Sequence, residues 1–118
     1  MIKKRKLPNK SYSVTFTMPT LNGVDELYLL GEFNDWNPAA NPMAKAADGS
    51  WSAKLTLAGE KEYQYRYRDN NGVWYNDYEP DAYVRNEYGA DNCVVSLVNG
   101  VTRKAPTKKI LERKKKAL

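Results

Sequence analysis

Regular alternation of apolar and polar residues in several short stretches is the feature that most restricts the fold of this chain. Residues 12–18, 51–57 and 63–67 each place apolar or aromatic side chains at every second position. A period of two is typical of a β-strand with one buried face, because successive side chains of a strand point to opposite sides. The sequence therefore predicts three half-buried strands.

Turn-forming residues separate these stretches from one another and from shorter apolar runs. The turns are predicted at 19–23, 48–49, 58–60 and 69–72. Three more strands are predicted at 27–30, 73–75 and 92–98. Residues 80–91 are predicted to form a long loop. Short strands with closely spaced turn signals indicate an all-β fold, an antiparallel β-sandwich.

One domain fits a chain of 118 residues, which is long enough to bury a single core. We expect the sandwich to span 11–98, with flexible basic tails at 1–10 and 99–118. Pro106 can start a helix, and the residues after it are permissive for one. The C-terminal segment is therefore expected to be a frayed helix or a disordered tail, with a helix docked on the sandwich as the alternative.

The sequence also bears on the compartment. No run approaches the roughly 20 apolar residues of a membrane-spanning helix. We read no export signal, because Pro8, Asn9 and Lys10 stand where its apolar stretch would be. Cys93 is the single cysteine, so no internal disulfide can form. This suits a reducing cytoplasm, with Cys93 as a small buried hydrophobe.

The formal net charge of +5 is distributed unevenly along the chain. Residues 1–10 carry five cations and no acid, and residues 99–118 carry eight cations and one acid. The residues between them hold six cations against thirteen acids. Because the basicity belongs to the two ends, the charge pattern disfavours a nucleic-acid platform on the folded surface.

Trp36 stands in an unusual place for a tryptophan. It follows the apolar run 27–30 and Gly31, and it lies between Asp35 and Asn37 in a turn-forming segment. An indole there is poorly placed for a core and well placed to stack against a planar partner. The residues alone leave that partner open: a sugar ring, a nucleobase or another protein.

Trp74 is a second candidate platform, because polar loops flank it. Strand periodicity instead assigns Trp51 and the tyrosines of 63–67 to the core or its rim. The axial C–H groups of a pyranose can pack on an aromatic face, and amide or guanidinium groups can bind its hydroxyls. Such polar groups are offered by Arg66, Asn34 and Asn92. Each also fits an ordinary role, surface solubility for the arginine and turn geometry for the asparagines.

The sequence carries no recognisable catalytic pattern. It has no histidine, no metal-ligand cluster, no serine in a nucleophile elbow and no phosphate-cradling glycine spacing. Asp77, Glu79 and Asp81 are close enough in sequence for a glycosidase carboxylate pair, but a solvated acidic loop is favoured. We therefore expect a binding module that is not an enzyme and needs neither cofactor nor metal.

An ordered set of short motifs resembles one known family. The motifs are LLGEFNDW (29–36), PM (42–43), DGSW (48–51), YQYRY (63–67), GVW (72–74), DYEP (77–80) and YGADN (88–92). Over about residues 12–98 the chain is similar to the glycogen- and starch-binding modules of carbohydrate-binding family 48. That family includes the N-terminal early-set domains of isoamylase and branching enzymes, and the glycogen-binding domain of the β subunit of AMP-activated kinase.

The resemblance implies an immunoglobulin-like sandwich that binds α-1,4-glucan. In binding members two tryptophans cradle consecutive glucose units, and Trp36 and Trp74 occupy those positions. Arg66 stands where the kinase modules carry a lysine that bonds to sugar hydroxyls, and Asn92 matches the asparagine that opens the final strand and does the same. Tyr88 falls where a leucine inserts into the curved glucan.

The expected ligands are glycogen, amylopectin and maltooligosaccharides, and the expected partner is an enzyme or a kinase complex. Two rival readings remain. Many N-terminal modules of the family are structural, so the sandwich can be a protein-interaction domain that binds no glucan. The basic tails can instead make the chain a nucleic-acid binder in which Trp36 stacks on a base. The salt dependence of binding distinguishes glucan binding from nucleic-acid binding. Contacts to phosphate weaken steeply as ionic strength rises, whereas contacts to a neutral glucan do not.

Overall fold

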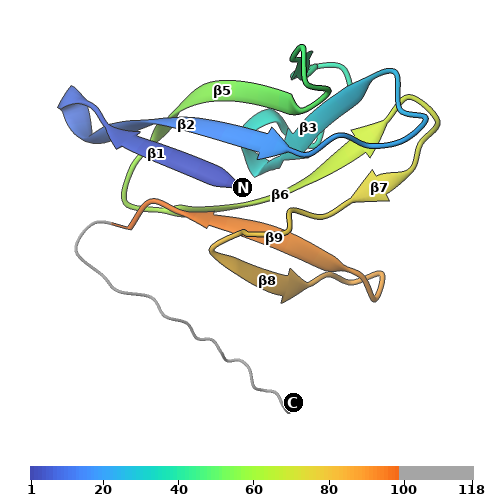
Figure 1. The fold of residues 1–118 in the computed structure, drawn as a ribbon. Coiled ribbons are helices and arrows are strands. Elements are labelled where there is room, and N and C mark those ends of the chain that lie inside the picture. The colour runs from blue at the N-terminus through green and yellow to red at the C-terminus, as the bar shows by residue number, and fades with distance from the viewer. Residues whose placement is uncertain (99–118) are drawn as a thin grey trace.

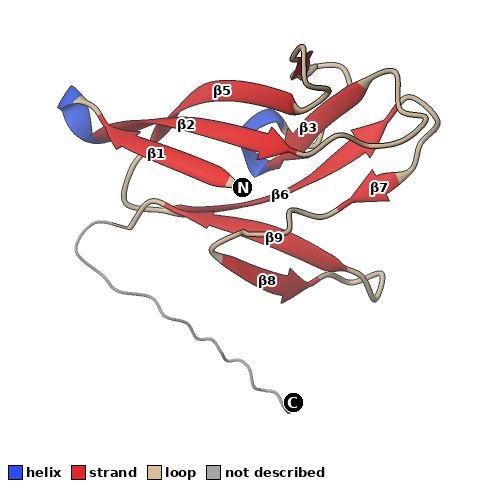
Figure 2. Ribbon diagram, viewed as in Figure 1, coloured by secondary structure: helices blue, strands red, loops and turns tan. Residues whose placement is uncertain are grey.

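The alternating stretches form strands, and the strands assemble into two sheets that pack face to face (Figure 1). The computed structural model describes residues 1–98, so the predictions for 99–118 lie outside the described residues. Two single 3-10 turns interrupt the strands, which dominate the described part of the chain (Figure 2). The elements are β1 (Ile2–Lys6), η1 (Pro8–Lys10), β2 (Ser11–Met18), β3 (Leu27–Gly31), η2 (Glu32–Asn34), β4 (Ala44–Lys45), β5 (Trp51–Ala58), β6 (Glu62–Asp69), β7 (Trp74–Tyr75), β8 (Ala82–Arg85) and β9 (Asp91–Ser96).

The first sheet has the strand order β1-β2-β5-β4, and the second has the order β3-β6-β9-β8, with β7 added beside β6. All of these strand pairs are antiparallel. The predicted all-β, immunoglobulin-like antiparallel sandwich is therefore confirmed for the described residues.

The core lies between the sheets and is rich in aromatic rings. Phe16 of β2 meets Tyr65 of β6 edge to face, with ring centroids 5.0 Å apart. Tyr65 in turn packs at 85° against Tyr67, 5.8 Å away. Trp51 is also fully enclosed. The prediction that the tyrosines of β6 and Trp51 belong to the core is confirmed, and the alternate residues of β6 face outward.

The N-terminal residues are not a flexible tail, so that prediction is wrong. Ile2 to Lys6 form β1, which pairs with β2 along its whole length. Ile2 packs against the core, while the cations on this edge strand are exposed. Charged residues on an edge strand discourage pairing with other chains. The same charges hid the strand in the sequence, because they leave only one apolar residue in it.

The long loop predicted at 80–91 contains a strand, which is a second correction. Ala82 to Arg85 form β8 at the edge of the second sheet. Its short length and the proline before it concealed it. The strand matters for the site, because it turns back into β9 through residues 86–90.

Asp77 corrects the expectation of a solvated acidic loop. Its side chain is fully enclosed and accepts hydrogen bonds from the hydroxyls of Tyr65 (2.8 Å) and Tyr67 (3.1 Å) and from the backbone N–H of Glu79 (3.0 Å). The amino group of Met1 also contacts it. Burial, with help from Asp77, raises the pKa of both tyrosines well above the ordinary value, so they stay protonated donors. Asp77 therefore anchors the loop after β7 to the core.

Cys93 is buried, as predicted, and burial raises the pKa of its thiol to about 12. Its sulfur accepts a hydrogen bond from the backbone N–H of Asp77. A thiol that stays protonated is a poor nucleophile. Within residues 1–98 no helix has the length and apolar character needed to cross a bilayer.

Candidate functional site

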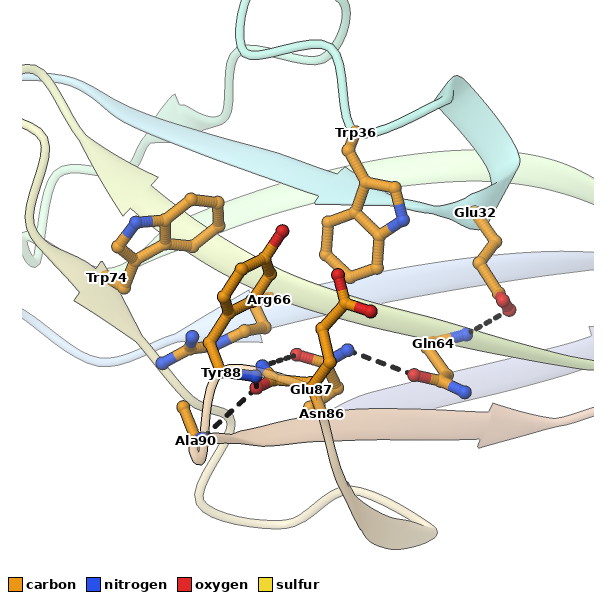
Figure 3. A pocket seen from close by; sticks show the side chains of 10 residues that line it. Glu32, Trp36, Gln64, Arg66, Trp74, Asn86, Glu87, Tyr88 and Ala90 are labelled. Carbon is orange, nitrogen blue, oxygen red and sulfur yellow. Dashed lines mark hydrogen bonds between the residues drawn. The ribbon is translucent and has the colours of Figure 1, made fainter.

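One face of the second sheet is hollowed into a depression of about 770 Å³ (Figure 3). It is bounded by the turn after η2, by β6 and β7, and by the turn between β8 and β9. The lining residues are Glu32, Trp36, Gln64, Arg66, Trp74, Asn86, Glu87, Tyr88, Ala90 and Asn92. Five of the six residues singled out from the sequence therefore meet at one surface; Asn34 does not.

Trp36 reaches the depression from a tight turn. Asp35 and Trp36 both adopt left-handed backbone conformations, with φ of 56° and 58°, and the N–H of Trp36 donates to the carbonyl of Gly31 (2.9 Å). A side chain at Gly31 would lie 2.7 Å from the carbonyl oxygen of Gln64, so the close approach of this turn to β6 needs glycine. The indole is half-buried, with one part open to the depression.

Asn34 holds that turn and does not line the depression. Its amide nitrogen donates to the carbonyl of Leu29 (3.0 Å) and to the side chain of Asn41 (2.7 Å), and its oxygen accepts from the N–H of Gly31 (3.0 Å). With these groups engaged, Asn34 is placed to fix the loop that carries Trp36. This is the turn-geometry role that the sequence left open.

Trp74 forms the other wall and is 41% exposed. The guanidinium carbons of Arg66 and Arg68 lie 5.2 and 5.6 Å from its ring centroid, close enough for cation–π attraction. The two guanidinium groups therefore lie beside the indole, part of which stays exposed.

Asp69 shapes the turn that delivers Trp74. Its carboxylate accepts hydrogen bonds from the N–H groups of Asn71 (2.8 Å) and Val73 (2.9 Å) and from the hydroxyl of Tyr75 (2.8 Å). Burial alone would raise the pKa of Asp69, but these bonds outweigh it and hold the pKa below its ordinary value. The carboxylate form is therefore the one that stabilises the turn.

Arg66 lies on the floor of the depression next to Trp74. Its Nε donates to the side chain of Asn76 (2.7 Å), which fixes the plane of the guanidinium. Strand parity predicts that Arg66 faces away from the core, because Tyr65 and Tyr67 face inward, and the structure agrees. Its remaining N–H groups are available to a ligand.

Asn92 belongs to a chain of side-chain amides on the same floor. It donates to Gln64 (2.9 Å) and accepts from Asn86 (3.1 Å), and it is almost completely covered. These two bonds occupy one donor and one acceptor position of Asn92. Gln64 is less buried than Asn92 and keeps its own amide nitrogen, so Gln64 presents the more accessible amide group to a ligand.

Tyr88 stands at the tip of the turn between β8 and β9 and is 84% exposed. The side-chain oxygen of Asn86 accepts from the N–H groups of Tyr88 (2.9 Å) and Ala90 (3.1 Å), which closes the turn. Figure 3 shows the phenol ring and the carboxylate of Glu87 both rising from this turn toward the tryptophans. Interaction with the neighbouring Glu87 carboxylate raises the pKa of Tyr88.

Sequence reasoning missed five residues of the depression: Glu32 and Gln64, and Asn86, Glu87 and Ala90 in or beside the turn after β8. Gln64 has the same strand parity as Arg66, so the alternation of β6 could have identified it. Glu32 accepts from the backbone N–H of Gln64 (2.8 Å), a contact between distant segments that no local pattern signals. Glu87 depends on the turn after β8, and β8 itself was not predicted.

The depression offers stacking surfaces and hydrogen-bonding groups. Among the described residues no group of acidic or cysteine side chains could hold a metal ion. The buried Asp77 is unavailable for the carboxylate pair considered from the sequence. Aromatic walls over a floor of amide and guanidinium groups define a β-sandwich binding module.

Comparison with known proteins shows to which family of binding modules the chain belongs. Residues 22–84 match carbohydrate-binding module 48, the isoamylase N-terminal domain, and the chain belongs to this family. The chain is 36% identical over 92 residues to an amylopullulanase from Thermoanaerobacter thermohydrosulfuricus, an alignment that covers 73% of this chain and 6% of that protein. It is 36% identical over 56 residues to a chloroplastic/amyloplastic 1,4-alpha-glucan-branching enzyme from Oryza sativa subsp. japonica, covering 42% of this chain and 7% of the enzyme. The match thus spans less than a tenth of each relative.

Proposed function

We propose that the module binds α-1,4-glucan without catalysis, in the form of glycogen, amylopectin or maltooligosaccharides. The observation that carries the proposal is the meeting of Trp36, Trp74 and Arg66 at one depression. The names of both relatives refer to glucans, which supports this choice of polymer.

The two indoles suit consecutive glucose units. The apolar faces of pyranose rings pack on the aromatic walls, and water leaves both surfaces. The ring hydroxyls then face the floor, where Arg66 and Gln64 offer donors, and Glu87 offers an acceptor from the turn between β8 and β9. An open depression of this kind gives modest affinity, and we expect a Kd of about 0.1–1 mM for a short maltooligosaccharide.

We also propose that the module serves a partner enzyme, which it would hold on the polymer. Both relatives are named as enzymes and are far longer than the aligned region. The identity of the partner is a separate matter from the glucan site, and the test below addresses only the site.

The test is the substitution Trp36→Ala, followed by affinity electrophoresis in gels with glycogen, with amylopectin or without polysaccharide. We expect the variant to lose measurable retardation while its melting temperature changes little, because the indole is half-exposed. The matched control is Tyr78→Ala, which removes an aromatic ring that is 56% exposed and lies outside the depression. Unaltered retardation of Trp36→Ala, or equal loss in both variants, would refute the assignment.

A further inference from the structure

The strands of the first sheet carry only one sign of charge. None of β1, β2, β4 and β5 contains an aspartate or glutamate. Together they carry six cations: Lys3, Lys4, Arg5, Lys6, Lys45 and Lys54. The sandwich therefore has a basic sheet on the side opposite the depression, although acids outnumber cations thirteen to eleven over residues 1–98.

The strand register places two of these cations in line across the outer face of the first sheet. Thr15 faces outward, because its neighbours Val14 and Phe16 are buried in the core. Lys3 pairs with Thr15 on one side, and Lys54 pairs with Thr15 on the other. The two lysine backbones are thus roughly 10 Å apart. Two long side chains at this spacing can reach one small anion above the threonine hydroxyl.

A shallow depression of about 510 Å³ adjoins this row of residues. Thr15, Ser52 and Lys54 line it together with Asn41 at its edge. The side-chain oxygen of Asn41 accepts from Asn34, so its amide nitrogen remains a donor toward the depression. The surface therefore combines ammonium groups with hydroxyl and amide donors and has no aromatic side chain in its lining.

The cations of this row are not neutralised within the described residues. Lys4, which is directed to the other side of β1, pairs with Asp81 at 2.7 Å. Neither Lys3 nor Lys54 has an ion pair in residues 1–98, and neither does Arg5, which follows Lys3 on the same face. An anion arriving here meets several unpaired positive charges.

We propose that the outer face of the first sheet binds a phosphate monoester carried on an α-glucan chain. A phosphate monoester is largely dianionic at neutral pH and offers three acceptor oxygens, which match two ammonium groups and a hydroxyl. The choice of a glucan as carrier rests on the function proposed above. The first depression suits the neutral part of the polymer, because its two lining acids, Glu32 and Glu87, outnumber its one lining cation, Arg66, and disfavour phosphate.

Other macromolecules fit the surface less well. Protein interfaces are enriched in aromatic residues and depleted in lysine and serine, the reverse of what this face presents. Single-stranded nucleic acids stack their bases on aromatic side chains, and none lines this depression. Hydroxyl and amide donors beside the lysines suit the sugar that carries the phosphate.

The experiment compares binding of the full chain to phosphorylated amylopectin with binding to the same polymer after phosphatase treatment. The wild-type protein should bind the phosphorylated polymer about three- to tenfold more tightly at low salt. The double variant Lys3→Gln/Lys54→Gln should bind both polymers equally. The control Lys10→Gln/Lys61→Gln removes the same charge outside the row and should keep the difference. Equal binding of both polymers by the wild-type protein, or equal loss in the control, overturns the proposal.

The Trp36→Ala variant and titrations with small ligands distinguish the proposed glucan site from the proposed phosphate site. Trp36→Ala should lose affinity for the dephosphorylated polymer and keep the preference for phosphate. Suppose that Trp36→Ala binds both polymers as tightly as the wild-type protein, while the lysine variant loses the preference for the phosphorylated polymer. The glucan site proposed at Trp36 would then be wrong, and the phosphate site would be supported. In an NMR titration, glucose 6-phosphate should shift the amide resonances of Thr15, Ser52 and Lys54. Inorganic phosphate should shift the same resonances but bind more weakly. Shifts confined to the first depression, or equal lysine-dependent binding of single-stranded DNA, overturn the proposal.

Discussion

Arg66 connects the aromatic wall of the depression to its polar floor. Its guanidinium stacks near Trp74 while Asn76 holds Nε, so the remaining donors have a fixed direction. Because one bond from a charged donor to a neutral hydroxyl contributes on the order of 1–3 kcal/mol, Arg66→Ala should weaken maltoheptaose binding about tenfold or more.

The salt dependence of that loss tests the ligand. In titration calorimetry, the ratio of the Kd of Arg66→Ala to the Kd of the wild type should be the same at low and high salt, because maltoheptaose is uncharged. Arg85→Ala is the control, since Arg85 is exposed, pairs with Asp91 and lies outside the depression. A loss seen only at low salt would instead favour an anionic ligand such as nucleic acid.

We expect Asp69 to make the proposed glucan binding sensitive to acid. Its pKa is below the ordinary value in the folded protein, so its contribution to stability is fully present above the unfolded pKa of about 3.8 and disappears as pH falls through the lower folded value. Protonation weakens the bonds to Val73 and Tyr75 that fix the turn before Trp74.

We therefore expect maltoheptaose affinity, followed by NMR from pH 7 to pH 3, to be constant down to about pH 4 and to fall below it. Asp69→Ala should weaken binding already at pH 7. Asp48→Ala should leave the profile unchanged, although hydrogen bonds from Ser50 lower the pKa of Asp48 as well. A profile that is identical in Asp69→Ala and the wild type would show that the turn does not control Trp74.

At the scale of elements, β1 is the strand whose contribution can be measured most directly. Ile2 packs against the core from this edge strand. Because the residue is only partly buried, Ile2→Ala should cost about 1 kcal/mol and lower the melting temperature by about 4–8 °C. Lys6→Ala, which changes an exposed side chain of the same strand, should leave the melting temperature within about 2 °C of the wild type. Equal melting temperatures for Ile2→Ala and the wild type would mean that β1 is not docked in solution.

At the scale of the molecule, the depression on the second sheet is lined entirely by residues within 32–92. A shortened chain of residues 1–98 should therefore keep the fold and the maltoheptaose affinity of the full chain, within about twofold. Circular dichroism and calorimetry on both chains check this. A folded shortened chain that no longer binds maltoheptaose would place part of the site in residues 99–118.

The sequence was sufficient for the strands whose side chains alternate and for the direction of their side chains. Periodicity in β2, β5 and β6 predicted which apolar side chains pack in or against the core, and the same parity predicted that Arg66 faces outward. The turn residues around Trp36 predicted that its indole would not enter the core. These features depend on neighbours a few positions away, which a sequence displays directly.

The structure alone decided features that depend on segments distant in sequence. β1 and β8 are short strands at sheet edges, held by pairing with β2 and β9 rather than by their own apolar pattern. Asp77 is buried because two core tyrosines offer it hydroxyl donors, and nothing in the loop sequence reveals those donors. Asn34 faces the turn interior because its amide nitrogen donates hydrogen bonds there to the carbonyl of Leu29 and to the side chain of Asn41. Local chemistry thus determined which residues face outward, while packing of the sheets determined which of them meet.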